Sequence, residues 1–143
     1  MIKNIIAGMA VGIAKVIPGV SGGTMMVLMG VFNKIMEAIR VKKLRENAVI
    51  PTYGSEFAAG ADLYACLEES VTINPGETVL IHTGVAVEIP EGFGGFVFAR
   101  SGLATKRGLA PSNKVGVIDC DYRGELMVSL YNQSGETQKV EHG

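Results

Sequence analysis

The most informative segment of the chain is RSGLATKRGLAPSNKVGVIDCDYRGELMVSL, from Arg100 to Leu130. Within it, Val115–Ile118 is apolar and rich in β-branched residues, which predicts a buried strand. The polar residues Asp119–Gly124 predict a turn, and Glu125–Asn132 predicts a return strand. We therefore expect a hairpin whose polar turn follows directly on an apolar strand.

The tripeptide Arg100-Ser101-Gly102 opens this stretch and predicts a second turn, one with anion-binding chemistry. A guanidinium is a forked donor that matches phosphate oxygens, and glycine lets the main chain approach a ligand closely. Either motif alone is commonly only a turn or a solvated hairpin tip. Together, in this order and joined by Asn113, the two motifs are specific enough to indicate a protein family.

The motifs resemble those of the trimeric dUTP diphosphatases (dUTPases). Ala99–Ala104 is similar to the second motif of that family, ARSGLA, and Asn113–Gly124 is similar to the third, NxxGxIDxDYxG. The first motif, AGxDL, stands at Ala59–Leu63. All three occur in the family's order, and the resemblance covers roughly residues 41–143.

Short β-rich runs between Gly and Pro turns predict an all-β domain over residues 41–143. Nineteen glycines with only 6% aromatic residues fit this class better than a helical one. The expected strands, besides those above, are Val41–Asn47, Val71–Asn74, Thr78–Ile89 and Gly95–Ala99. The resemblance implies a jelly-roll-like subunit that assembles as a homotrimer, which would cover the exposed sheet edges.

The resemblance also implies an activity, the hydrolysis of dUTP to dUMP and pyrophosphate with Mg²⁺ on the triphosphate. This reaction of nucleotide metabolism keeps uracil out of DNA. The family pattern makes Asp119 the general base and places Asp62 near the water or the metal. The implied substrate-binding residues are Arg100, Ser101 and Gly102 for phosphate, Asn113, Val117 and Ile118 for uracil, and Tyr122 and Met127 for the rest of the nucleoside pocket.

Two of these assignments have competing interpretations. Met127 can equally be a core residue, and Asp62 can be a turn-capping residue, although a carboxylate among small and apolar neighbours needs a partner. His82, inside an expected strand, has no partner near it in the sequence and receives no role.

Residues 1–40 differ from the rest, because between Asn4 and Asn33 the only charge is Lys15. The run GMAVGIAKVIPGVSGGT resembles the first segment of a polytopic bacterial membrane family linked to undecaprenyl-phosphate translocation. We expect an apolar, helical segment. Three origins stay open: a fusion or a wrongly assigned start, a membrane tether, or an additional buried helix.

The net charge of −1 gives no indication of a nucleic-acid partner, and the two cysteines form neither a metal-ligand spacing nor a disulfide framework. These features favour a cytoplasmic protein, with residues 1–40 as its only candidate membrane anchor.

The family's fourth and fifth motifs would lie at and beyond Gly143, so we expect weakened activity. The alternatives are a non-catalytic nucleotide-binding module and an enzyme related to the dCTP deaminases.

Overall fold

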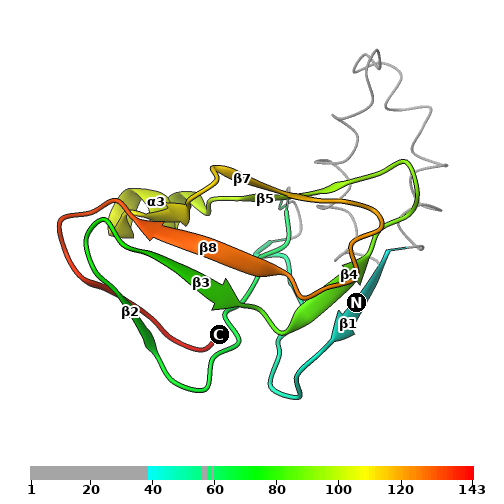
Figure 1. Cartoon of the computed structure of the whole chain (residues 1–143), viewed down its shortest axis with the longest axis horizontal. Coiled ribbons are helices and arrows are strands. Elements are labelled where there is room, and N and C mark those ends of the chain that lie inside the picture. The colour runs from blue at the N-terminus through cyan, green and yellow to red at the C-terminus, as the bar shows by residue number, and fades with distance from the viewer. Residues whose placement is uncertain (1–38, 56–57, 59) are drawn as a thin grey trace, which may run out of the picture.

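The structure is a computed structural model that describes residues 39–55, 58 and 60–143. Strands dominate these residues, with one short helix among them, which confirms the all-β prediction (Figure 1). The elements in chain order are β1 (Arg40–Lys43), β2 (Val71–Ile73), β3 (Thr78–His82), β4 (Val85–Glu88), β5 (Gly95–Phe98), α3 (Ser101–Arg107), β6 (Leu109–Pro111), β7 (Val115–Ile118), β8 (Met127–Asn132) and β9 (Gln138–Val140).

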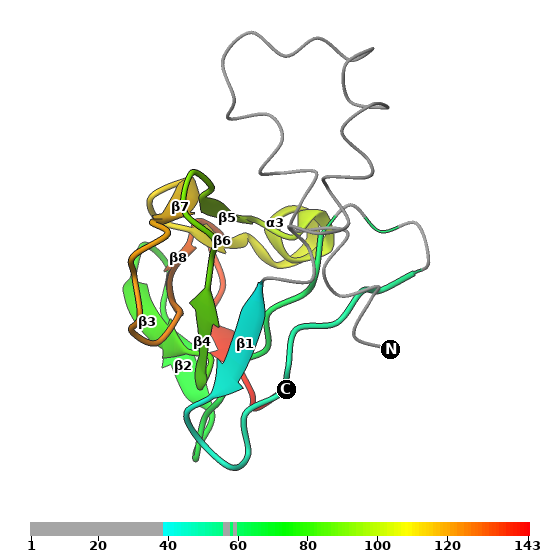
Figure 2. The ribbon, with the colours of Figure 1, turned by 90° about the vertical axis from the view of Figure 1, so that its right-hand side faces the viewer.

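The described strands form four small antiparallel sheets rather than one large one. β1 pairs with β4, β2 with β9 and β5 with β7, and β8 lies between β3 and β6. Figures 1 and 2 show the β5–β7 pair alongside the β3–β8–β6 sheet. The helix α3 leads directly into β6 and contacts it (Figure 2).

The predicted hairpin is wrong in its pairing, although its two strands and its turn are present. β7 pairs with β5, from Gly95↔Ile118 to Phe98↔Val115, and β8 pairs with β3 and β6. β7 is also less buried than predicted, because Ile118 is buried but Val117 is 64% exposed. The turn therefore joins two separate sheets.

The expected strand Thr78–Ile89 is divided in two. Thr83 and Gly84 separate β3 from β4, and Gly84 has φ of 67°, a left-handed conformation that favours glycine. A Cβ at Gly84 would also lie 2.7 Å from Ala48 Cβ and 2.8 Å from Cys66 Sγ. The expected strand Val41–Asn47 is likewise shorter, since β1 ends at Lys43 and the amide of Leu44 donates to the Gly84 carbonyl over 2.7 Å.

The predicted turn at Arg100-Ser101-Gly102 is instead the start of helix α3. Most residues from Leu103 to Arg107 are good helix formers. Gly108 ends the helix with φ of 65°, and its amide donates to the Leu103 carbonyl. A glycine directly after Lys106-Arg107 is a sequence signal for a helix C-terminus, and it could have identified α3.

The main core lies around β4, the C-terminal end of β7 and the turn that follows β7. Its buried members are Ala48, Cys66, Val85, Val87, Ile89, Ile118 and Leu126. Both cysteines are free: Cys66 is buried and Cys120 is half-buried in the turn. In the described ranges, no helix is long and apolar enough to cross a membrane. The helical segment predicted for residues 1–40 lies outside the described residues, apart from Ile39 and Arg40.

Candidate active site

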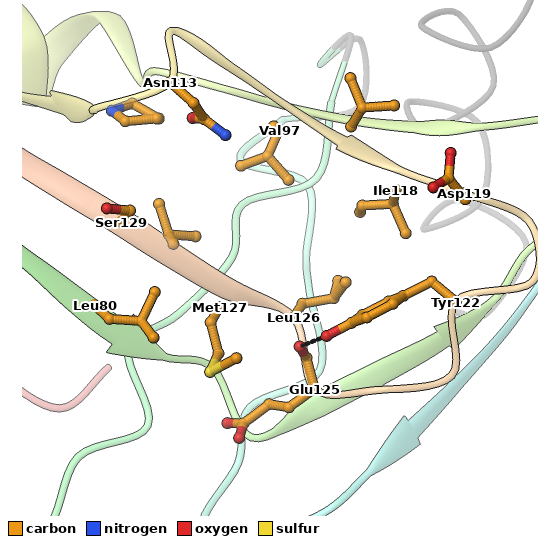
Figure 3. A pocket seen from close by; sticks show the side chains of 14 residues that line it. Leu80, Val97, Asn113, Ile118, Asp119, Tyr122, Glu125, Leu126, Met127 and Ser129 are labelled. Atoms are coloured by element: carbon orange, nitrogen blue, oxygen red, sulfur yellow. Dashed lines mark hydrogen bonds between the residues drawn. The ribbon is translucent and has the colours of Figure 1, made fainter.

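A cavity of about 250 Å³ lies between β7 and β8. It is lined by Leu80, Val97, Pro111, Asn113, Gly116, Val117, Ile118, Asp119, Tyr122, Glu125, Leu126, Met127, Val128 and Ser129. Six of the residues predicted from the third motif and the return strand are in this set: Asn113, Val117, Ile118, Asp119, Tyr122 and Met127. Figure 3 shows Asn113 near the start of β7, Asp119 and Tyr122 beyond its end, and Met127 and Leu80 across the cavity.

The sheet topology explains why the space exists. β6 covers β8 from Asn132 only as far as Leu130, and the Ser112 amide then donates to the Ser129 carbonyl over 2.8 Å. Beyond that point β7 diverges to pair with β5. Main-chain groups of two strands that do not pair with each other therefore border one pocket, a suitable arrangement for a flat polar ligand.

Asp119 and Tyr122 occupy the turn after β7. Asp119 is exposed, and its carbonyl accepts the Tyr122 amide over 3.1 Å. The Tyr122 hydroxyl donates to the Glu125 carbonyl over 2.8 Å (Figure 3). A Cβ at Gly124 would lie 2.6 Å from the Tyr122 Oη, so the ring folds back over a position that only glycine leaves free.

Sequence reasoning missed a polar cluster beside this cavity, formed by Arg45, His82 and Glu125. The Glu125 Oε2 lies 2.9 Å from His82 Nδ1, and its Oε1 accepts the Gly84 amide over 2.7 Å. Arg45 Nη2 lies 3.7 Å from the same Oε2. The partner that His82 lacked in the sequence comes from a residue far along the chain, so no local signal could have found it.

The cluster determines the ionisation of Glu125. Burial on its own raises the pKa of this carboxyl group, but the hydrogen bonds from His82 and the Gly84 amide outweigh that effect. The charges of His82 and Arg45 act in the same direction, so the pKa of Glu125 is lower than its ordinary value. Glu125 is therefore a carboxylate at neutral pH.

The residues predicted from the first and second motifs line a different, larger cavity of about 570 Å³, which includes Asp62, Arg100 and Ser101. Asp62 Oδ2 lies 3.6 Å from Arg100 Nη2, so the partner that the Asp62 carboxylate was expected to need is present. The Asp62 amide donates to the Thr52 carbonyl over 2.7 Å, which fixes this segment. Gly102 is exposed at the start of α3.

The two cavities share a wall made of Pro111, Val97, Ile118, Leu126 and Val128. Within one chain, Asn113, Asp119 and Tyr122 thus line only the smaller cavity, and Asp62, Arg100 and Ser101 line only the larger one. Among the described residues, no three His, Cys, Asp or Glu side chains gather in a way that could hold a metal ion. The acidic groups fit only a Mg²⁺ held mainly by phosphates and water, with one carboxylate added.

Comparison with known proteins identifies relatives of this chain. Residues 46–143 match the family model for dUTPase. The deoxyuridine 5′-triphosphate nucleotidohydrolase of Desulfitobacterium hafniense (strain DSM 10664 / DCB-2) is 55% identical over 95 residues, which cover 66% of this chain. The match spans only 63% of the length of that relative.

Solved structures of phage dUTPases share the fold. The Staphylococcus bacteriophage 80alpha dUTPase with dUPNHPP is 37% identical, with a TM-score of 0.60 over 66% of this chain and 54% of that one. A variant dUTPase from phage phi11 of S. aureus, described with a coordinated structural Mg(II) ion, is 36% identical, with a TM-score of 0.60 over 67% of this chain and 60% of that one. The described strands therefore have the jelly-roll-like architecture of dUTPases, as predicted.

Residues 11–61 match a second family model, which is described as undecaprenyl phosphate translocase-like. This match confirms the resemblance seen in residues 1–40. Most of it falls outside the described residues.

Proposed function

This chain belongs to the dUTPase family, and we propose on that basis that it hydrolyses dUTP to dUMP and pyrophosphate. The observation that carries the proposal is the single cavity between β7 and β8, which collects the third-motif residues from Asn113 to Tyr122. A pocket of about 250 Å³ between two unpaired strand edges has the size and the main-chain donors and acceptors that a pyrimidine nucleoside needs.

In this proposal each pocket residue has a role taken from the matching family motif. Asn113 and the main chain of Val117 and Ile118 bind the uracil edge. The ring of Tyr122 packs against the deoxyribose and leaves no room for a 2′-hydroxyl group, and Met127 completes the pocket. Arg100, Ser101 and the Gly102 amide bind phosphate oxygens through charge-assisted hydrogen bonds.

Asp119 holds the attacking water and accepts its proton. The water oxygen forms a bond to the α-phosphorus, and the bond from that phosphorus to the bridging oxygen breaks in line, which releases pyrophosphate. Bound Mg²⁺ would neutralise charge on the triphosphate and stabilise the leaving group. Asp62 is the carboxylate that would add an oxygen to the metal or water shell, beside its contact with Arg100.

The location of the two residue groups in different cavities that share a wall supports a homotrimer. In such an assembly the Arg100 group of one subunit would complete the Asp119 cavity of another. The exposed apolar side chains of Phe98 and Val117, which are 63% and 64% exposed, would then become covered. The proposed location is the cytoplasm.

Pyrophosphate release from dUTP by the purified chain, with and without Mg²⁺, tests the proposal. We expect turnover of dUTP but not of UTP, and its loss in Asp119→Asn. Ammonia release from dCTP would instead identify a dCTP deaminase-like enzyme. Stabilisation by dUTP without pyrophosphate release would identify a non-catalytic nucleotide-binding module.

A further inference from the structure

We propose that Glu125 is a positioning residue for Tyr122, and that His82 and the Gly84 amide hold it in place. Through this contact Glu125 would set the preference of the pocket for deoxyribose over ribose. The inference rests on the proposed function, in which the Tyr122 ring packs against the sugar.

The Tyr122 ring needs an external support because its surroundings do not immobilise it. The side chain is 41% exposed, so packing alone leaves it freedom to turn. Its hydroxyl group has one protein partner among the described residues, the Glu125 carbonyl at 2.8 Å. This hydrogen bond holds the hydroxyl end of the ring, which lies over Gly124, where an added Cβ would be 2.6 Å from the Tyr122 Oη.

Hydrogen bonds to the Glu125 side chain hold this residue, and with it its main-chain carbonyl group, in position. The two carboxylate oxygens reach different groups around the β3–β4 junction, Oε1 the Gly84 amide at 2.7 Å and Oε2 the His82 Nδ1 at 2.9 Å. Gly84 cannot move easily, because it packs against Ala48 and Cys66 in the core. The core therefore positions Glu125, and Glu125 positions the tyrosine.

The charged groups around Glu125 favour this arrangement. An ionised carboxylate can only accept, so the hydrogen bond between His82 Nδ1 and Glu125 Oε2 at 2.9 Å requires the hydrogen on Nδ1. In that tautomer Nδ1 cannot also accept from Arg45 Nη2, which lies 3.3 Å away. Arg45 instead adds positive charge 3.7 Å from Oε2. The lowered pKa of Glu125 keeps both carboxylate oxygens available as acceptors.

A competing explanation is that hydrogen bonds of Leu126 alone hold the turn between β7 and β8 in place. The Leu126 amide donates to the Val85 carbonyl over 2.8 Å, and Thr83 Oγ1 donates to the Leu126 carbonyl over 2.6 Å. If these two bonds sufficed, removal of the Glu125 carboxylate would leave Tyr122 in place. The two explanations predict different sugar selectivity.

The experiment measures the ratio of dissociation constants for UMP and dUMP, and the ratio of kcat/KM for dUTP and UTP, in the full chain. We expect Glu125→Ala to lower both ratios about tenfold. Glu125→Gln should retain most of the selectivity, since its amide oxygen can still accept the Gly84 hydrogen bond. Glu91→Ala, in an exposed turn, is the matched control and should change neither ratio.

A double-mutant cycle with Tyr122→Phe separates positioning from a general structural effect. If Glu125 acts through the tyrosine hydroxyl, Glu125→Ala should lower the ratios little further in the Tyr122→Phe background. Additive losses, or unchanged ratios in folded Glu125→Ala, would overturn the inference. If Glu125→Ala does not fold, His82→Ala replaces it, with an expected loss of about threefold, and an unchanged ratio again overturns the inference.

Binding and activity measurements on the wild-type protein separate a failure of this inference from a failure of the proposed dUTP hydrolysis. Preferential binding of dUMP without any release of pyrophosphate from dUTP would overturn the proposed activity only, since the binding ratio still tests Glu125. Equal affinity for dUMP and UMP would overturn the inference about Glu125, whereas release of pyrophosphate from dUTP would still support the proposed activity.

Discussion

Asp62 and Arg100, from the first and second motifs, form an ion pair with 3.6 Å between Asp62 Oδ2 and Arg100 Nη2. The Arg100 side chain is 67% exposed, so the remaining donors of its guanidinium group stay open to a ligand. A planar fork can contact a carboxylate on one side and phosphate oxygens on another, whereas an ammonium group offers a single charged point. This geometry makes Arg100 difficult to replace by another cation.

We therefore expect Arg100→Lys to lower kcat/KM for dUTP about 10- to 100-fold. The unfolding temperature should stay close to that of the wild type, because exposed ion pairs contribute little to stability. Steady-state kinetics and thermal unfolding check both parts. Arg40→Lys, at an exposed position of β1, is the control, and a similar loss there would contradict the specific role of Arg100.

Asp119→Asn should lower kcat about 10²- to 10⁴-fold, because an amide cannot accept the proton of the attacking water. The exposed position of Asp119 leads us to expect little change in stability or in dUMP affinity. Single-turnover kinetics and dUMP titration measure these quantities. Asp121→Asn lies two residues along the same turn, and an equal loss in that variant would argue against Asp119 as the base.

Gly84→Ala should destabilise the fold by more than about 2 kcal/mol, because the new Cβ meets Ala48 Cβ at 2.7 Å and Cys66 Sγ at 2.8 Å. Gly76→Ala controls for backbone strain alone, since Gly76 has φ of 76° but no atom within 4 Å of an added Cβ. Gly76→Ala should lower the free energy of unfolding by about 1 kcal/mol. Urea unfolding of both variants compares these losses. Equal losses would show that the structure around Gly84 relaxes to accommodate the added Cβ.

Gly124→Ala should reduce the preference for dUTP over UTP while the protein stays folded. The added Cβ would lie 2.6 Å from the Tyr122 Oη and 2.7 Å from its Cζ, so the ring must leave its position. Kinetics with both nucleotides measures the change. Gly135→Ala, where an added Cβ meets nothing within 4 Å, should keep the wild-type preference. Unchanged selectivity in Gly124→Ala would show that the ring position does not set the sugar preference.

Acid should remove the stabilising contribution of Glu125. Burial raises the pKa of this carboxyl group, but the His82 and Gly84 hydrogen bonds and the nearby charges lower it below the unfolded value, which is about 4.3. A lowered folded-state pKa means that the contribution is present above about pH 4.3 and is lost as the pH falls through the folded-state value. The free energy of unfolding of wild type minus that of Glu125→Gln should therefore shrink below about pH 4.3.

Urea unfolding at several pH values measures this difference, with Glu91→Gln as the exposed control. A difference between wild type and Glu125→Gln that stays constant down to about pH 3 would show that the Glu125 contacts do not stabilise the fold.

The all-β class, the approximate position of most strands and the family could be predicted from the sequence, because these depend on local features. Alternation of apolar residues, glycine at turns and the fixed spacing from Asn113 to Tyr122 are all set by near neighbours. Sequence also predicted that Asp62 needs a partner. It missed the helix α3, although Gly108 indicated its end, since the glycine of Arg100-Ser101-Gly102 favoured a turn.

Which strands pair, and which side chains meet, could be seen only in the folded chain. β7 pairs with β5 rather than with β8, and the space left between β7 and β8 is the cavity lined by Asn113, Asp119 and Tyr122. The contact of His82 with Glu125 follows from the antiparallel register that sets His82 opposite Met127, close to the turn. Such contacts depend on burial and hydrogen bonding between segments far apart in the chain, and no local pattern of residue types records them.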